Sequence, residues 1–98
     1  MLNNKLIYDF DPEKNAQLIS LRGISFEEII AALSTDKLLD VVTHPNQEKY
    51  SHQKMYAIEH NDYVFLVLFV ENDNKIFLKT AFPSRQAKKY YIDNRGDK

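Results

Sequence analysis

Three apolar segments in series, residues 55–60, 63–70 and 76–82, constrain the fold of this chain most. Only short polar runs separate them. Asn61-Asp62 predicts a two-residue hairpin turn, because Asn and Asp tolerate a positive φ angle. The run 72–74, Asn-Asp-Asn, predicts a slightly longer turn. Since strands joined by short turns run antiparallel, this half of the chain predicts an antiparallel meander.

The middle and last of these strands differ in pattern. The middle one, YVFLVLFV, does not alternate between apolar and polar residues, which predicts a central strand covered on both faces. The last one, IFLKTAF, has a lysine in an apolar strand. Simple alternation places four of its residues on one face, namely Ile76, Leu78, Thr80 and Phe82. It leaves three on the other face, namely Phe77, Lys79 and Ala81.

Two helices are predicted before the meander. Asp11 is expected as the N-cap of the first, with Pro12 at its first position, and the helix is expected to end at residue 21 or 22 before Gly23. Ser25 and Glu28 form the pattern of a capping box at the start of the second. The apolar face of this second helix follows a helical spacing and consists of Phe26, Ile29, Ile30 and Leu33.

Further strands are expected at residues 5–10 and 38–43, and residues 44–53 are expected to be a polar connection. A last helix is expected from about Arg85 to Asn94, with Tyr90 and Tyr91 facing the core beside Ala87 rather than stacking on bases. The element order is then β-α-α-β-β-β-β-α. This order predicts a single α+β domain over residues 1–98, with helices packed on a largely antiparallel sheet.

Composition excludes several classes of site. The 98 residues include no cysteine, so disulfides, thiolate metal sites and thiol nucleophiles are excluded. The three histidines, His44, His52 and His60, are eight residues apart, so none forms a helical metal pair, and no metal or cofactor is expected. No signal peptide pattern begins the chain, and the longest apolar run has eight residues. A soluble, cytoplasmic protein is therefore expected.

Positive charge is concentrated near the end of the chain. The net charge is −1, yet the stretch KIFLKTAFPSRQAKKYY, residues 75–91, contains five cations and no carboxylate. Lys79 and Arg85 are expected to converge on one anion, preferably a phosphate of a nucleic acid. The alternative is that Lys88 and Lys89 form an ordinary solvated helix face. Residues 50–54 include Tyr50, His52 and Lys54. They either line the cleft in which Lys79 and Arg85 would bind the anion or form a solvated loop.

Two blocks of sequence together resemble a known family. The first is YDFDPEKNAQLISLRGISFEEIIAAL, and the second is the basic stretch above. In this order and spacing, over about residues 7–91, they resemble the BrnT-type toxins of bacterial type II toxin–antitoxin systems, within the RelE/ParE-like group. Arg85 matches the arginine of the family's strand-end motif, and Lys79 lies where that strand usually has a basic residue. Arg22 departs from the family, which commonly has histidine there, and Phe82-Pro83-Ser84 replaces a simpler turn.

The resemblance implies a compact, RelE-like toxin that cleaves RNA or otherwise blocks translation. It also implies neutralisation by a small antitoxin, commonly of the ribbon-helix-helix type. The leading hypothesis is a metal-independent endoribonuclease that inhibits translation, with either free or ribosome-associated RNA as its substrate. Arg85 and Lys79 would stabilise transition-state charge, and His52 would act as general acid or base. The RNA-binding residues would be Lys54, Lys88 and Lys89.

Two other classes of function remain open from the sequence. One is a non-enzymatic toxin or binding module that acts on a protein target. The other is a structural or regulatory domain that binds a partner through an edge of its sheet.

Overall fold

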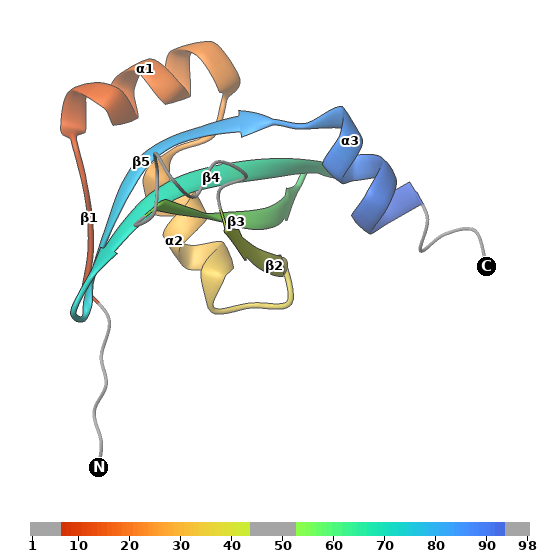
Figure 1. Cartoon of the computed structure of the whole chain (residues 1–98). Coiled ribbons are helices and arrows are strands. Elements are labelled where there is room, and N and C mark those ends of the chain that lie inside the picture. Colours follow the sequence, from red (N-terminus) through yellow and green to blue (C-terminus); the bar gives the residue numbers. More distant parts are fainter. Residues whose placement is uncertain (1–6, 44–52, 94–98) are drawn as a thin grey trace.

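The computed structural model describes residues 7–43 and 53–93, which form a five-stranded sheet with helices on both faces (Figure 1). The elements are β1 (Ile7–Phe10), α1 (Pro12–Arg22), α2 (Phe26–Leu33), β2 (Leu38–Thr43), β3 (Gln53–His60), β4 (Tyr63–Asn72), β5 (Lys75–Pro83), α3 (Arg85–Lys88) and the π-helical turn η1 (Lys89–Asp93). This confirms the predicted α+β class and element order. No helix in the described ranges is long and apolar enough to span a membrane.

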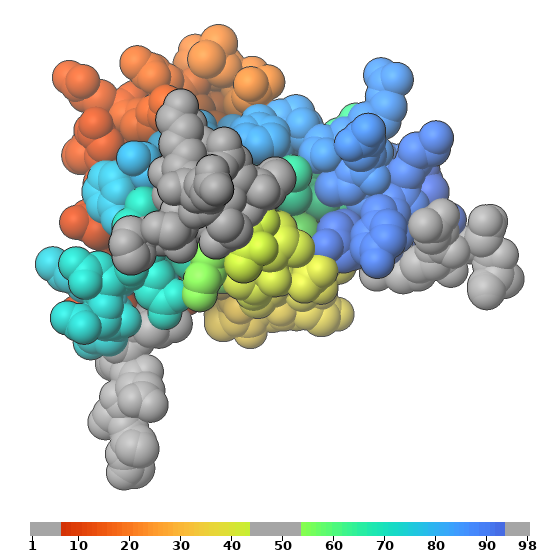
Figure 2. All heavy atoms as spheres, in the orientation of Figure 1, coloured from red at the N-terminus to blue at the C-terminus, as the bar shows by residue number. Residues whose placement is uncertain are grey.

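The strand order across the sheet is β1-β5-β4-β3-β2. The three neighbouring pairs formed by β2, β3, β4 and β5 are antiparallel. For β3–β4 and β4–β5 this confirms the prediction from the short turns. β1 instead runs parallel to β5, and its described residues pair with residues 75–78 of that strand. The second half of β5 therefore has no strand beside it on that side among the described residues. The helix α1 packs against β5, and its ribbon lies next to that of β5 in Figure 1. The atoms of the two elements are neighbours in Figure 2.

Local capping interactions set the ends of both long helices. The Asp11 side chain accepts a hydrogen bond from the Glu13 N–H at 3.0 Å, and Gly23 ends α1 with a φ angle of 73°. Ser25 accepts from the Glu28 N–H at 3.0 Å, while the Glu28 carboxylate accepts from the Ser25 N–H at 2.9 Å. Each interaction joins residues at most four positions apart, and each confirms the sequence prediction.

The main core lies between the sheet and the two long helices. Phe26 and Ile29 of α2 are fully buried, and Leu18 is the buried apolar residue of α1. They pack against the inward side chains of three strands, namely Tyr56, Ile58, Phe65, Val67, Phe69, Ile76, Leu78 and Ala81. Burial of this apolar surface is the main source of stability, at about 25 cal/mol per Å².

A β-bulge in β5 changes which residues face this core. Leu68 of β4 pairs with Thr80, but its neighbour Phe69 pairs with Leu78, so Lys79 is an extra residue in the ladder. Beyond the bulge the alternation reverses. Ala81 is therefore buried with Leu78, and the predicted grouping of Thr80 with Leu78 on one face is wrong.

The two turns of the meander are both tight. Asn61 and Asp62 have φ angles of 54° and 63°, which confirms the predicted two-residue hairpin. The turn between β4 and β5 is shorter than predicted, because Asn72 already pairs with Lys75. Only two residues remain to connect the strands, and Asp73 has a φ angle of 59°.

The opposite face of the sheet is covered only in part. Ala87 of α3 is buried against Ala57 and Val64, with Tyr91 and partly buried neighbours packed around them. Further along β4, Leu68 and Val70 remain half-buried, so that strand is fully covered on both faces only near its start. Tyr90 is 67% exposed, which contradicts its predicted place in the core. The wider π-helical turn that begins at residue 89 rotates it outward.

Candidate functional site

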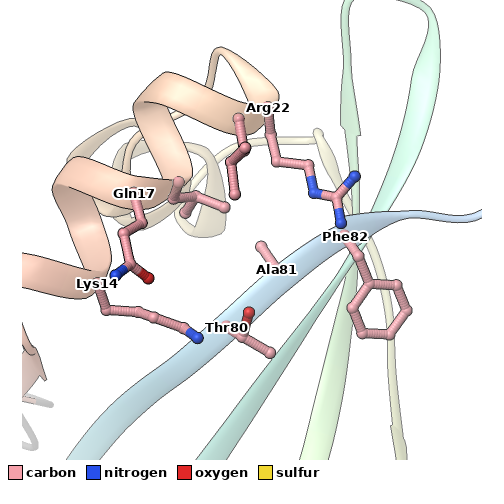
Figure 3. Close-up of a pocket in the computed structure, with 8 residues that line it drawn as sticks. Lys14, Gln17, Arg22, Thr80, Ala81 and Phe82 are labelled. Atoms are coloured by element: carbon pink, nitrogen blue, oxygen red, sulfur yellow. The ribbon is translucent and has the colours of Figure 1, made fainter.

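A cleft of about 180 Å³ separates α1 from the second half of β5 (Figure 3). We refer to it as the α1–β5 cleft. The helix contributes Lys14, Gln17, Leu18, Leu21 and Arg22, and the strand contributes Thr80, Ala81 and Phe82. The cleft exists because β1 ends before reaching this part of β5, so a helix rather than a strand is its neighbour.

Two cations stand at the ends of this cleft. Lys14 and Arg22 are eight residues apart on α1, which places them on the same side of the helix, about 12 Å apart along its axis. Lys14 extends toward Thr80 and Arg22 toward Phe82 (Figure 3). No carboxylate is among the described lining residues, and neither cation forms an ion pair within residues 7–43 and 53–93. This spacing suits an extended polyanion better than a single small anion.

Asn15 orients the helix that forms the cleft. Its side-chain Oδ1 accepts a hydrogen bond from the Phe26 N–H at 2.7 Å, and its Nδ2 donates to Glu27 Oε1 at 2.9 Å. Asn15 is only 9% exposed, so these bonds join α1 to the start of α2 below the surface. With Asn15 facing inward, the adjacent Lys14 is exposed at the cleft.

A second hollow, of about 330 Å³, lies at the first half of β5. We refer to it as the β5 hollow. Its lining residues are Asp9, Val70, Asn72, Lys75, Ile76, Phe77 and Lys79. Phe77 pairs with Val70 in the antiparallel ladder and with Asp9 in the parallel one, so these three side chains share a face. Two lysines and one carboxylate make this hollow net positive.

The predicted catalytic residues are distributed as follows. Lys79 lines the β5 hollow and lies at the bulge in mid-strand rather than near the strand end. Arg85 is exposed at the first position of α3 and lines neither of the two hollows. The convergence of Lys79 and Arg85 on one phosphate stays a prediction. His52 lies outside the described residues.

The predicted RNA-binding lysines differ in whether a nearby carboxylate neutralises their charge. Lys54 forms an ion pair with Glu71 at 3.3 Å, and Lys88 pairs with Asp93 at 3.1 Å. The Lys88 Nζ also lies 5.8 Å from the centre of the Tyr63 ring. Lys89 is exposed on η1. Partial neutralisation leaves Lys54 and Lys88 weaker candidates for phosphate binding than Lys89.

Sequence reasoning missed the two cations of the α1–β5 cleft. Lys14 and Arg22 are part of the first family-like block, but the charge count drew attention to residues 75–91 instead. The signal was present: Lys14, Leu18 and Arg22 follow an i, i+4, i+8 spacing, with a buried leucine between two cations. This spacing predicts a helix whose cations lie next to the face that packs against the core.

Tyr91 connects η1 to β2 and so has a structural role. Its hydroxyl donates a hydrogen bond to Asp40 Oδ2 at 2.6 Å, which connects η1 to the opposite edge of the sheet. Burial, together with this bond, raises the pKa of Tyr91 to about 12. The hydroxyl is therefore a donor that stays protonated at neutral pH, not a general base.

Comparison of the chain with protein-family models, with curated proteins and with solved structures found no match. Function is therefore inferred from the residues of this chain. Within residues 7–43 and 53–93, no three metal-ligating side chains come together.

Proposed function

We propose that this protein is an RNA-directed toxin of a type II toxin–antitoxin system, with a RelE-like fold, whose α1–β5 cleft binds the RNA backbone. The two sequence blocks that resemble BrnT-type toxins support the toxin class. The observation that carries the RNA proposal is the pair Lys14 and Arg22, both directed across the cleft with no carboxylate among its described lining residues.

The chemistry of the pair suits phosphates. The guanidinium of Arg22 presents a planar fork of donors that matches two phosphate oxygens, and the Lys14 ammonium acts as a compact positive charge. Binding of phosphates at both ends releases counterions, so the affinity of the complex would fall steeply with salt. Thr80 and Gln17, between the two cations, offer hydroxyl and amide groups to the sugar.

Cleavage would need groups beyond this cleft. Attack of the RNA 2′-hydroxyl on the adjacent phosphate requires a base, an acid for the leaving 5′-oxygen, and cations that stabilise the charged intermediate. We assign charge stabilisation to Arg85 and Lys79 and proton transfer to His52, as the sequence predicts. In this scheme Lys14 and Arg22 position the strand, and the exposed Lys89 binds a flanking phosphate.

The alternative is a toxin that binds its target without cleaving it. It uses the described side chains of the α1–β5 cleft and the β5 hollow, which are cations, apolar groups and hydrogen-bonding groups suited to binding. Under either proposal we expect a cognate antitoxin of the ribbon-helix-helix type. An acidic segment of it would cover the cations of residues 75–91 until the antitoxin is degraded.

Induced expression in a bacterial host tests the proposal. The wild-type chain is expected to arrest growth, and purified protein to cut RNA, with or without ribosomes. The Lys14→Ala/Arg22→Ala double variant and the Arg85→Ala variant should each relieve the arrest. Lys37→Ala is the matched control, because it removes an exposed lysine that lines neither hollow.

The outcomes separate the alternatives. Arrest without RNA cleavage in either setting favours the non-enzymatic toxin. Undiminished arrest by the double variant removes the cleft from the mechanism. If the wild-type chain does not arrest growth at all, the toxin proposal is wrong.

A further inference from the structure

The β5 hollow contains an aromatic ring that folding leaves partly in solvent. Phe77 is 40% exposed, although its backbone has a strand on both sides, with Val70 of β4 as one partner and Asp9 of β1 as the other. The side chains on either side of it along the strand, Ile76 and Leu78, are almost fully buried in the main core. The core therefore fixes the backbone of Phe77 while its ring lines a hollow open to solvent.

Cations stand on both sides of this ring. Lys75 and Lys79 lie two residues before and two residues after Phe77, and all three line the β5 hollow. Four strand residues span about 13 Å, so the backbone positions of the two lysines lie on opposite sides of Phe77 along the strand. Neither lysine forms an ion pair with a described carboxylate.

The walls of the hollow add an apolar side chain and polar groups. Half-buried Val70 lies beside Phe77 across the ladder. Asn72 contributes an amide, and Asp9 contributes a carboxylate whose Oδ1 accepts the Phe10 N–H at 2.8 Å. This leaves the second Asp9 oxygen to accept from a ligand. A flat apolar surface with cations at both ends and a few hydrogen-bonding groups at the rim matches an unpaired nucleobase and its two neighbouring phosphates.

We propose that the β5 hollow binds one unpaired base of a single-stranded RNA, stacked on Phe77, with the phosphates on either side of it held by Lys75 and Lys79. This inference rests on the proposed action on RNA and deepens it by naming the substrate class as single-stranded. A paired base is excluded from such a hollow, because its faces are covered by its neighbours in the helix.

Fluorescence anisotropy with three labelled ligands of equal length tests the proposal. The ligands are a single-stranded RNA, an abasic ribose–phosphate strand with the same charge, and a duplex RNA. The proteins are wild type, Phe77→Leu, and Tyr90→Leu as a control that removes another exposed ring far along the chain. Thermal unfolding of each protein verifies that the variants fold.

The expected result distinguishes the contribution of base stacking to affinity from that of electrostatic attraction to the phosphates. Stacking of one base is worth about 5- to 150-fold in affinity. Wild type should bind the single-stranded RNA more tightly than the abasic strand by that factor, and more tightly than the duplex. Phe77→Leu should lose the preference over the abasic strand while binding that strand as before, and Tyr90→Leu should behave as wild type.

Other results overturn the inference in distinguishable ways. If RNA binds but Phe77→Leu keeps the preference, or wild type binds the abasic strand equally well, the stacking inference is wrong and the RNA-directed function stands. If wild type binds none of the three ligands, both fail. If Phe77→Leu weakens all three ligands alike, the ring supports the structure and does not contact a base.

Discussion

Removal of the Asn15 amide should weaken the attachment of α1 to α2 by about 2 kcal/mol. Asn15→Ala leaves the Phe26 N–H, at a fully buried residue, without its 2.7 Å acceptor. An unsatisfied buried donor costs about 1–3 kcal/mol. Loss of the 2.9 Å bond to Glu27 adds about 0.5–1 kcal/mol, which the better helix propensity of alanine roughly offsets.

Urea and thermal unfolding measure this cost. For a domain of this size, about 2 kcal/mol corresponds to a fall of about 8–16 °C in Tm. Gln17→Ala is the control on the same helix. Gln17 is exposed, and its side chain forms no hydrogen bond with another described residue. Gln17→Ala should therefore change the free energy of unfolding by no more than about 0.5 kcal/mol.

A second substitution at Asn15 tests the two hydrogen bonds separately. Asn15→Asp keeps an acceptor for the Phe26 N–H but sets a carboxylate against Glu27 in place of the donor. The repulsion disappears when either carboxylate takes up a proton. The deficit relative to wild type should therefore shrink as the pH falls from 7 to about 4. A pH-independent deficit, or an Asn15→Ala variant as stable as wild type, would refute the reasoning.

Three further outcomes are expected. In titrations of single-stranded RNA, Lys14→Ala and Arg22→Ala should each reduce the slope of log K against log salt by about 0.7, and unchanged slopes would place the RNA elsewhere. Tyr91→Phe should cost about 1 kcal/mol near pH 7, because it removes the bond to Asp40. That cost should disappear as the pH rises from 10 to about 12, because the tyrosine ionises in the unfolded chain before it ionises in the folded one. A difference in unfolding free energy that stays constant over this pH range in urea unfolding would contradict this. Gly23→Ala should cost about 1 kcal/mol of stability from the positive φ angle alone, because no atom lies within 4 Å of the added Cβ. A clearly larger cost in thermal unfolding would reveal a steric clash.

The sequence by itself determined the parts of this protein that depend on near neighbours in the chain. The caps at Asp11, Gly23 and Ser25 and the Asn61-Asp62 hairpin were predictable, because each interaction closes within a few residues. The bounds of β2 were predicted to the residue. The class of the fold follows from the order of these elements.

Only the tertiary structure decided where the side chains of β5 point and what lies beside it. The bulge at Lys79 depends on how β5 pairs with β4, so the strand's own alternation could not reveal that Ala81, rather than Thr80, faces the core. The short parallel pairing of β1 likewise leaves part of β5 to α1, and this creates the cleft between Lys14 and Arg22. Both features arise from contacts between residues far apart in the sequence, for which local patterns contain no signal.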